Sequence, residues 1–221
     1  MQPAEGIRFV HIAIKAEVRE LEADAHAAES PDALASYGAR LDRFASIVEA
    51  HNAGEEDGLF ADLEQRAPRI PATYLFDHHD ETELFAALRA QLATARGASA
   101  PARAGELARL RRHAIALTEH VTAHVRKEDT LVTPVVVELF SPSEQGAQIG
   151  KMMARFSPEL MAQVMPWMVG KLELDDRCAY VGMLQRVMPP ERFPIACGWI
   201  RGGIGETAWA ALAARVPGLP A

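Results

Sequence analysis

Two stretches of the sequence repeat the same arrangement of metal-binding side chains. "HNAGEEDGLF" begins at His51 and "HVRKEDTLVTP" begins at His124, and each places a glutamate, Glu55 or Glu128, four residues after the histidine. Residues four apart in a helix lie on one face, with their Cβ atoms about 5–6 Å apart. An imidazole and a carboxylate at that separation can bind one divalent cation or share two. The repeat therefore predicts a metal site.

Single histidines on two further segments add to this site. His11 lies in an apolar stripe with Ile7 and Ile14, and "FDHHDE" carries the adjacent His78 and His79. Burying carboxylates and imidazoles without partners is costly, and a pair of divalent cations removes that cost. Imidazole and carboxylate without thiolate suit iron, manganese or zinc rather than copper(I) or an iron–sulfur cluster. The two cysteines, Cys178 and Cys197, form neither a CxxC pair nor a disulfide framework, which favours a reducing cytoplasm.

Four long amphipathic segments between residues 4 and 140 must position these side chains. The second segment starts at "SPDALA", where Ser30 can cap a helix and Pro31 can take its first position. The third follows "RIPATY", and the fourth follows the breaker-rich "RGASAPARAG" and should kink at Pro134. The inward stripes of the second and fourth segments are expected at Leu41, Phe44, Val48, His51, Glu55, Leu59 and Leu63, and at Leu107, Leu110, Leu117, His120, His124, Glu128, Leu131 and Val135.

Short connections between four such helices predict an all-α, up-down-up-down four-helix bundle over residues 1–140. From "SPSEQG" onward, prolines and glycines interrupt shorter apolar segments, so residues 141–221 are expected to form an appended domain of short helices. Seven of the eight methionines lie between Met152 and Met188. These helices can be simple core or an adaptable surface for a protein partner, and we favour core.

Composition and charge exclude several classes of protein. The net charge is −7 and the pI is about 5.6, so a nucleic-acid partner is not expected. The start, "MQPAEGIRFVHIAIK", has no basic region followed by a long apolar core, so we expect no signal peptide. No apolar run approaches the roughly 18 residues of a membrane span, and we expect no membrane partner.

The His and Glu pattern over roughly residues 5–140 resembles that of the hemerythrin-like (HHE cation-binding) family. The resemblance implies two iron ions with an oxo or hydroxo bridge inside a four-helix bundle, with histidine ligands from all four helices. It implies that Glu55 and Glu128 bridge the irons and that His11, His51 and His124 are ligands. The third-helix ligand is His78 or His79, and we prefer His78 because it shares a stripe with Phe85.

Two departures from the oxygen carriers of this family change the expected function. Those proteins have HxxxH on the third helix and HxxxxD on the fourth, whereas here Thr82 follows His78 by four residues and the fourth helix has HxxxE. The chain is similar instead to a variant with one histidine on the third helix, implicated in iron or oxygen sensing and peroxide handling. We therefore expect a protein that binds oxygen, nitric oxide or peroxide. A peroxide-decomposing or oxygenase enzyme and a structural zinc bundle are the alternatives, and manganese is another candidate metal.

Other polar residues near the expected ligands keep several roles open. His120, one turn before His124, is an extra ligand, a group that orients a ligand, or a pocket residue. Glu81 is either a third-helix ligand that compensates for Thr82 or a boundary glutamate. The flanking polar residues are expected to be solvated or to support the ligands: Asn52, Glu56, Asp57 and Asp129. The segment "MPWMVGKL" resembles the stretch that follows hemerythrin domains in plant iron-sensing ubiquitin ligases.

Overall fold

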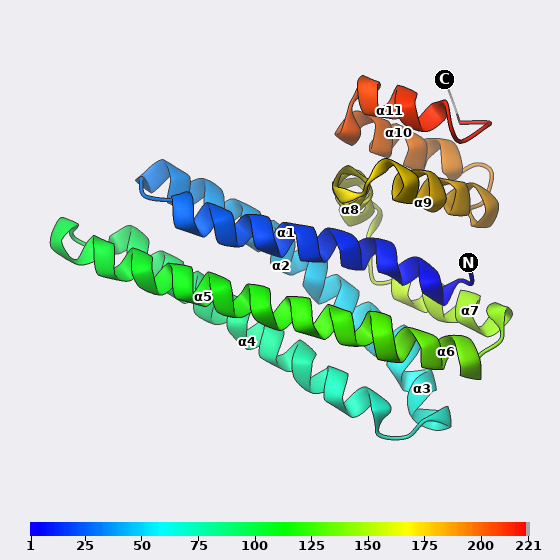
Figure 1. The fold of residues 1–221 in the computed structure, drawn as a ribbon, viewed down its shortest axis with the longest axis horizontal. Coiled ribbons are helices and arrows are strands. Elements are labelled where there is room, and N and C mark those ends of the chain that lie inside the picture. Colours follow the sequence, from blue (N-terminus) through cyan, green and yellow to red (C-terminus); the bar gives the residue numbers. More distant parts are fainter. Residues whose placement is uncertain (220–221) are drawn as a thin grey trace. The chain divides into compact units, whose positions relative to one another are not determined.

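The computed structural model describes residues 1–219 (Figure 1), and within that range the chain is helical with no strand. The all-α prediction is therefore confirmed. The helices are η1 (Ala4–Ile7), α1 (Arg8–Ala27), α2 (Pro31–Glu55), η2 (Glu56–Phe60), α3 (Ala61–Arg66), α4 (Ile70–Gly97), α5 (Ala100–Lys127), η3 (Glu128–Val132), α6 (Thr133–Leu139), α7 (Pro142–Met153), α8 (Pro158–Lys171), α9 (Leu174–Val187), α10 (Phe193–Ile204) and α11 (Glu206–Ala213).

The helices α1, α2, α4 and α5 run alternately up and down and form the predicted bundle (Figure 1). Ser30 caps α2 as predicted, since its hydroxyl accepts a hydrogen bond from the backbone N–H of Ala33 at 3.1 Å and Pro31 is the first helical residue. The helix α4 begins at Ile70, earlier than the predicted start after Tyr74. Pro71 fits in this first turn because an N–H there has no helical partner to lose.

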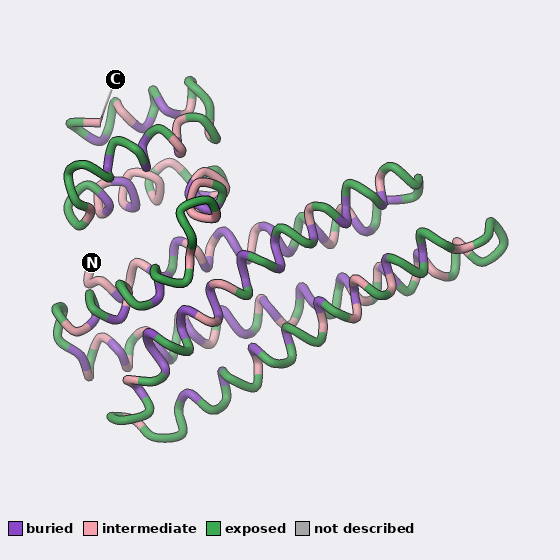
Figure 2. The backbone as a smooth tube through the Cα atoms, turned by 180° about the vertical axis from the view of Figure 1, so that it is seen from behind, coloured by how far each residue is buried: buried purple, intermediate pink, exposed green. Residues whose placement is uncertain are grey.

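The interior of the bundle changes from apolar to polar along the helices. Phe44 and Phe85 meet edge to face with their ring centroids 5.8 Å apart, and the leucines around them are almost fully buried. Figure 2 shows buried residues repeated along the long helices, as amphipathic faces require. Elsewhere along the bundle axis the buried residues are histidines and glutamates, and these form the candidate site.

Two π-helical turns interrupt the helices that carry the repeated motif. The turn η2 directly follows Glu55, and η3 begins at Glu128. The prediction that Leu131 and Val135 face inward was wrong: Leu131 is 58% exposed and Val135 is only partly buried, while Val132 and Val136 are buried. A π turn holds an extra residue, so the inward positions after Glu128 are shifted by one.

The end of α2 and the π turn η2 lie against α7 at two glycines. A Cβ added at Gly58 would lie 2.7 Å from the carbonyl oxygen of Gln148 and 2.7 Å from Cγ of Met152. At Gly54 the nearest atom would be the carbonyl oxygen of Met152, at 3.1 Å. The absence of side chains at both positions lets the backbone of α7 approach the segment that carries Glu55.

The chain forms two compact units, and α7 belongs to the unit that contains most of the bundle, residues 2–4 and 14–155. The other unit contains residues 5–13 and the short helices that follow residue 155. The predicted short helices after residue 141 are therefore present as α7 to α11. The domain boundary predicted between residues 140 and 141 stays a prediction.

Within the second unit, α8 to α11 and the first turns of α1 enclose an apolar core. The rings of Phe9 and Tyr180 meet edge to face at 5.4 Å, and Met165 and Met168 are buried beside them. These methionines are core residues, as we favoured, and a protein partner for these helices stays a prediction. Ser157 caps α8 by accepting a hydrogen bond from the N–H of Leu160 at 3.2 Å.

The described residues contain no helix that is long and apolar enough to cross a membrane. Both cysteines are free thiols: Cys197 is buried and Cys178 is partly buried.

Candidate metal centre

The structure brings together all six residues that the sequence pattern singles out. His11, His51, Glu55 and Glu128 form one group, in which one donor atom from each residue lies within 4.8 Å of the others. A second group of the same kind consists of Glu55, His78, His124 and Glu128. All six side chains are buried, and the two glutamates belong to both groups.

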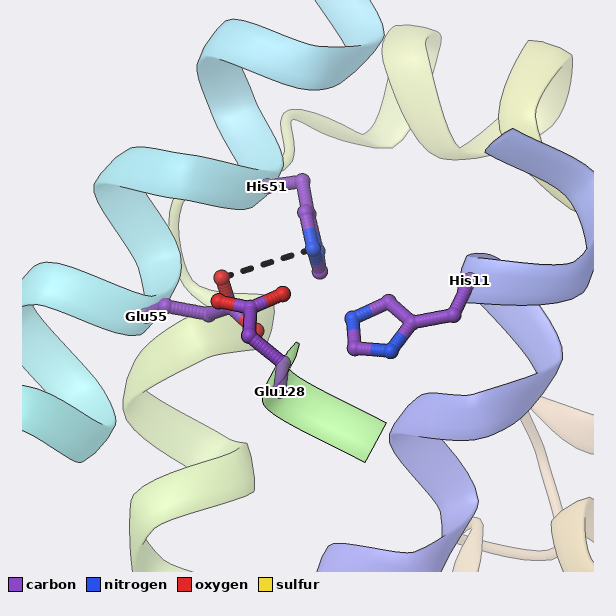
Figure 3. A group of neighbouring side chains, drawn as sticks. All are labelled: His11, His51, Glu55 and Glu128. Carbon is purple, nitrogen blue, oxygen red and sulfur yellow. Dashed lines mark ion pairs between the residues drawn. The ribbon is translucent and has the colours of Figure 1, made fainter. Parts of the chain in front are cut away.

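Figure 3 shows the first group, with the imidazoles of His11 and His51 beside the two carboxylates. Nε2 of His51 lies 3.4 Å from Oε2 of Glu55, one helical turn away on α2. The ring of His11 faces the carboxylates from α1 (Figure 3). This arrangement places donors from three helices around one point.

The second group shares the same two carboxylates. Nε2 of His124 lies 3.3 Å from Oε1 of Glu128, and Nε2 of His78 lies 3.6 Å from Oε2 of Glu55 and 3.9 Å from Oε1 of Glu128. These distances exceed those of good hydrogen bonds. They suit atoms that each lie about 2.0–2.2 Å from a shared cation. Nε2 of His78 and Nε2 of His124 are buried without hydrogen bonds, so the donor set fits a metal ion.

The two shared carboxylates lie where α2 and α5 pass into the π turns η2 and η3. Glu55 is the last residue of α2 before η2, and Glu128 is the first residue of η3. Single π turns in long helices occur frequently at functional sites, because the extra residue redirects the neighbouring side chains. The repeated motif in the sequence therefore corresponds to a repeated distortion of the backbone.

Acidic side chains hold the outer nitrogens of two histidines. Nδ1 of His78 donates a hydrogen bond to Oε1 of Glu56 at 2.9 Å, and Nδ1 of His124 donates to Oδ2 of Asp77 at 3.1 Å. The ammonium of Lys127 also donates to Oδ2 of Asp77. A hydrogen bond at Nδ1 fixes the tautomer in which Nε2 carries the free lone pair. Both rings therefore present Nε2 to the second group.

The carboxylates and the burial have opposite effects on these two histidines. Burial lowers the pKa of His78, but the neighbouring carboxylates of Glu128 and Glu55 outweigh burial and raise that pKa to about 11. Burial, and after it the positive charge of His78, lowers the pKa of His124 to about 4. The ring of His78 thus carries the proton that compensates part of the negative charge of Glu55 and Glu128.

Aromatic rings surround the second group on its apolar side. Phe60 stacks on His78 with ring centroids 5.6 Å apart, and Tyr74 lies 6.2 Å from the ring of His124. Phe60 and Tyr74 also contact each other, at 5.8 Å. Because both are buried, they keep water away from the two imidazoles and strengthen the electrostatic interactions there.

The alternatives that the sequence left open have different positions in the structure. His78 is buried in the second group, whereas His79 is exposed. His120 lies outside both groups, and its Nε2 donates to the backbone carbonyl of Asp77 at 3.1 Å. Glu81 is buried but also lies outside both groups. Thr82 is exposed, and its hydroxyl donates to the carbonyl of His78.

Sequence reasoning missed the supporting role of Asp77 and Lys127. It included Glu56 only among residues that were solvated or supporting. The acid directly before the His78–His79 pair was the available signal for Asp77, since buried metal-binding imidazoles usually have a carboxylate or carbonyl partner. Its actual partner is on another helix, and periodicity along one helix cannot identify such a contact.

Sequence comparisons find a matching family and several similar plant proteins. Residues 2–136 match the model of the family described as "Hemerythrin HHE cation binding domain". The chain is similar to the "Zinc finger protein BRUTUS" of Arabidopsis thaliana, with 26% identity over 71% of this chain and 12% of that protein. Two BRUTUS-like zinc finger proteins of the same plant are 22% and 21% identical over 83% of this chain, which spans only 15% of their length. No solved structure matches the chain.

Proposed function

Because this chain belongs to the hemerythrin HHE cation-binding family, we propose that its bundle binds two iron ions and through them a small ligand such as oxygen, nitric oxide or peroxide. The observation that carries this proposal is that two buried donor groups share Glu55 and Glu128. Glu55 and Glu128 would be shared by two cations, and each cation would take its imidazoles from two different helices. Imidazole and carboxylate donors without thiolate favour iron over copper(I).

The number of protein donors supports ligand binding rather than a purely structural metal site. Each group supplies four residues. Non-haem iron sites that react with small molecules keep coordination positions open for them. The third helix supplies one imidazole, since Thr82 is exposed. When bound, a pair of irons supplies reversible one-electron and oxygen chemistry.

The residues of this chain control that chemistry in three ways. Glu55 and Glu128 hold the negative charge that attracts the cations, and Glu56 and Asp77 orient His78 and His124 through Nδ1. The aromatic rings beside the second group exclude water. We propose that this combination serves sensing of oxygen, iron or redox state. Structural zinc of the kind named in the relatives requires clustered cysteines, and this chain has two cysteines without a CxxC pair.

The test is metal analysis of the purified full chain combined with anaerobic titration by ferrous iron. We expect two irons per chain and a visible charge-transfer absorption after exposure to air. The matched control is a Glu55→Gln, Glu128→Gln double variant, which keeps the side-chain volumes and removes both shared carboxylates. Binding of one iron or none by the native chain, or equal binding by the double variant, would contradict the proposal. Stoichiometric zinc with no absorption change would assign the bundle to zinc instead.

A further inference from the structure

A buried glutamate outside both donor groups has one oxygen that needs a partner. Glu81 on α4 is 2% exposed. Its Oε2 accepts a hydrogen bond from Nδ2 of Asn52 on α2 at 2.9 Å, while Oε1 is buried and makes no hydrogen bond. Leaving a buried carboxylate oxygen without a donor or a cation is energetically unfavourable, so the position is informative.

The surroundings of Glu81 indicate which partner fits. Glu81 follows His78 by one turn on the inward face of α4, and His78, His120 and Glu55 all interact with it electrostatically. Burial raises its pKa, and the hydrogen bond from Asn52 and the charges of the two histidines oppose that rise. The region around it is therefore rich in the groups that bind divalent cations.

We propose that Glu81 is a further ligand, through Oε1, of the cation held by Glu55, His78, His124 and Glu128. This inference rests on the proposed metal-binding function. Glu81 lies outside both donor groups, so coordination requires its side chain to rotate toward His78. Asn52 binds Oε2 and leaves Oε1 as the oxygen that can reach a cation.

The proposal makes the two cation positions chemically different. The position at His11 and His51 has four protein donors, and the position at His78 and His124 gains a fifth donor from Glu81. The carboxylate of Glu81 adds negative charge at the position of His78 and His124, which favours a cation of higher charge there. It also occupies one coordination position of that cation. The open positions for a small ligand are therefore concentrated at the cation bound by His11 and His51.

Cobalt(II) is a suitable probe, because its visible ligand-field absorption becomes more intense as the coordination number falls. The full chain is stripped of metal with a chelator and titrated with cobalt(II), first as the native sequence and then as Glu81→Gln. The amide of glutamine can still accept the hydrogen bond from Asn52, and its weak donor oxygen is a poor ligand. The control is Glu83→Gln, which removes an exposed glutamate from the same helix.

We expect the native chain and Glu83→Gln to bind two cobalt ions identically. In Glu81→Gln, one of the two ions should bind at least about tenfold more weakly, with a more intense absorption. Glu81→Asp, which retains a carboxylate, should recover part of the affinity, and circular dichroism should show the same helix content in every variant. An unchanged spectrum in Glu81→Gln, with or without weaker binding, overturns direct coordination. Failure of the native chain to bind two ions overturns the proposed function instead.

Discussion

Asp77 on α4 accepts a hydrogen bond from Nδ1 of His124 on α5 at 3.1 Å, and Lys127 donates to the same carboxylate oxygen. Burial tends to raise the pKa of Asp77, but Lys127 and His124 outweigh burial and lower it. Asp77 therefore stays ionised and holds the imidazole with Nε2 directed at Glu128. Lys127 lies one turn after His124, so α5 supplies both the candidate ligand and the charge that balances its carboxylate partner.

Replacing Asp77 with asparagine should weaken metal binding by about 10–100-fold, because an amide keeps the shape of the side chain but loses the charge that makes His124 a better donor. Competition between the protein and a chelator for cobalt(II) measures the effect. Asp80→Asn, an exposed change on the same helix, is the control and should bind like the native chain. Native-like affinity in Asp77→Asn would mean that the hydrogen bond does not support the ligand.

The metal-free chain should show a stability maximum near the ordinary histidine pKa of 6.5, because His78 and His124 are shifted in opposite directions. The folded-state pKa of His78 is raised to about 11, so the stability it contributes is complete below pH 6.5 and is lost as the pH rises toward 11. The folded-state pKa of His124 is lowered to about 4, so stability is lost as the pH falls from 6.5 through 4.

Urea unfolding of chelator-treated protein gives the free energy of unfolding at each pH. Repeating it at intervals of about one pH unit, from about pH 4 to about pH 10, measures this dependence. His78→Gln should lose the decline on the alkaline side, and His124→Gln should lose part of the decline on the acid side. The same alkaline slope in the native chain and in His78→Gln would show that another group releases the proton.

Gly58→Ala should destabilise the bundle by about 1–3 kcal/mol, because the added methyl group would overlap the backbone of α7. Its Cβ would lie 2.7 Å from the carbonyl oxygen of Gln148, which belongs to a helix and cannot move alone. Gly146→Ala is the control, since no atom lies within 4 Å of a Cβ there. That change should raise the free energy of unfolding by about 0.5–1 kcal/mol through helix propensity. Equal stability of the two variants would rule out close packing of α7 on η2.

The bundle and the six candidate ligands were predictable from the sequence because both depend on local periodicity. Ile7, His11 and Ile14 follow the helical repeat, and so do the His51–Glu55 and His124–Glu128 pairs. A buried glutamate within such a stripe indicates chemistry, whatever the other helices do. The ordering of the helices then follows from short connections.

The register after Glu128 and the contacts between helices were not predictable in the same way. Leu131 follows the ideal helical repeat, but the π turn places Val132 in the interior instead. A run of four-residue steps, His51 to Glu55 to Leu59 to Leu63, exceeds the ideal period of 3.6 and was a usable signal for such turns. The contact of Asp77 with His124 depends on how α4 and α5 are aligned, which no single segment encodes.

The sharing of Glu55 and Glu128 between the two donor groups leads to a specific pattern of metal loss. Removing a residue of one group, as in His51→Ala or His124→Ala, should weaken the binding of one cation and leave the other cation bound. Glu55→Gln should weaken both, because its carboxylate belongs to both groups. Removing a ligand should lower the metal affinity at least as much as removing a residue that supports a ligand, which typically lowers it by roughly 10–100-fold. Iron per chain after dialysis against a chelator, measured for each variant beside the exposed His79→Ala, gives the pattern directly. Loss of both ions in His51→Ala and in His124→Ala would show that the two ions bind as one cooperative site. Retention of one tightly bound ion in Glu55→Gln would show that its carboxylate is not shared by both ions.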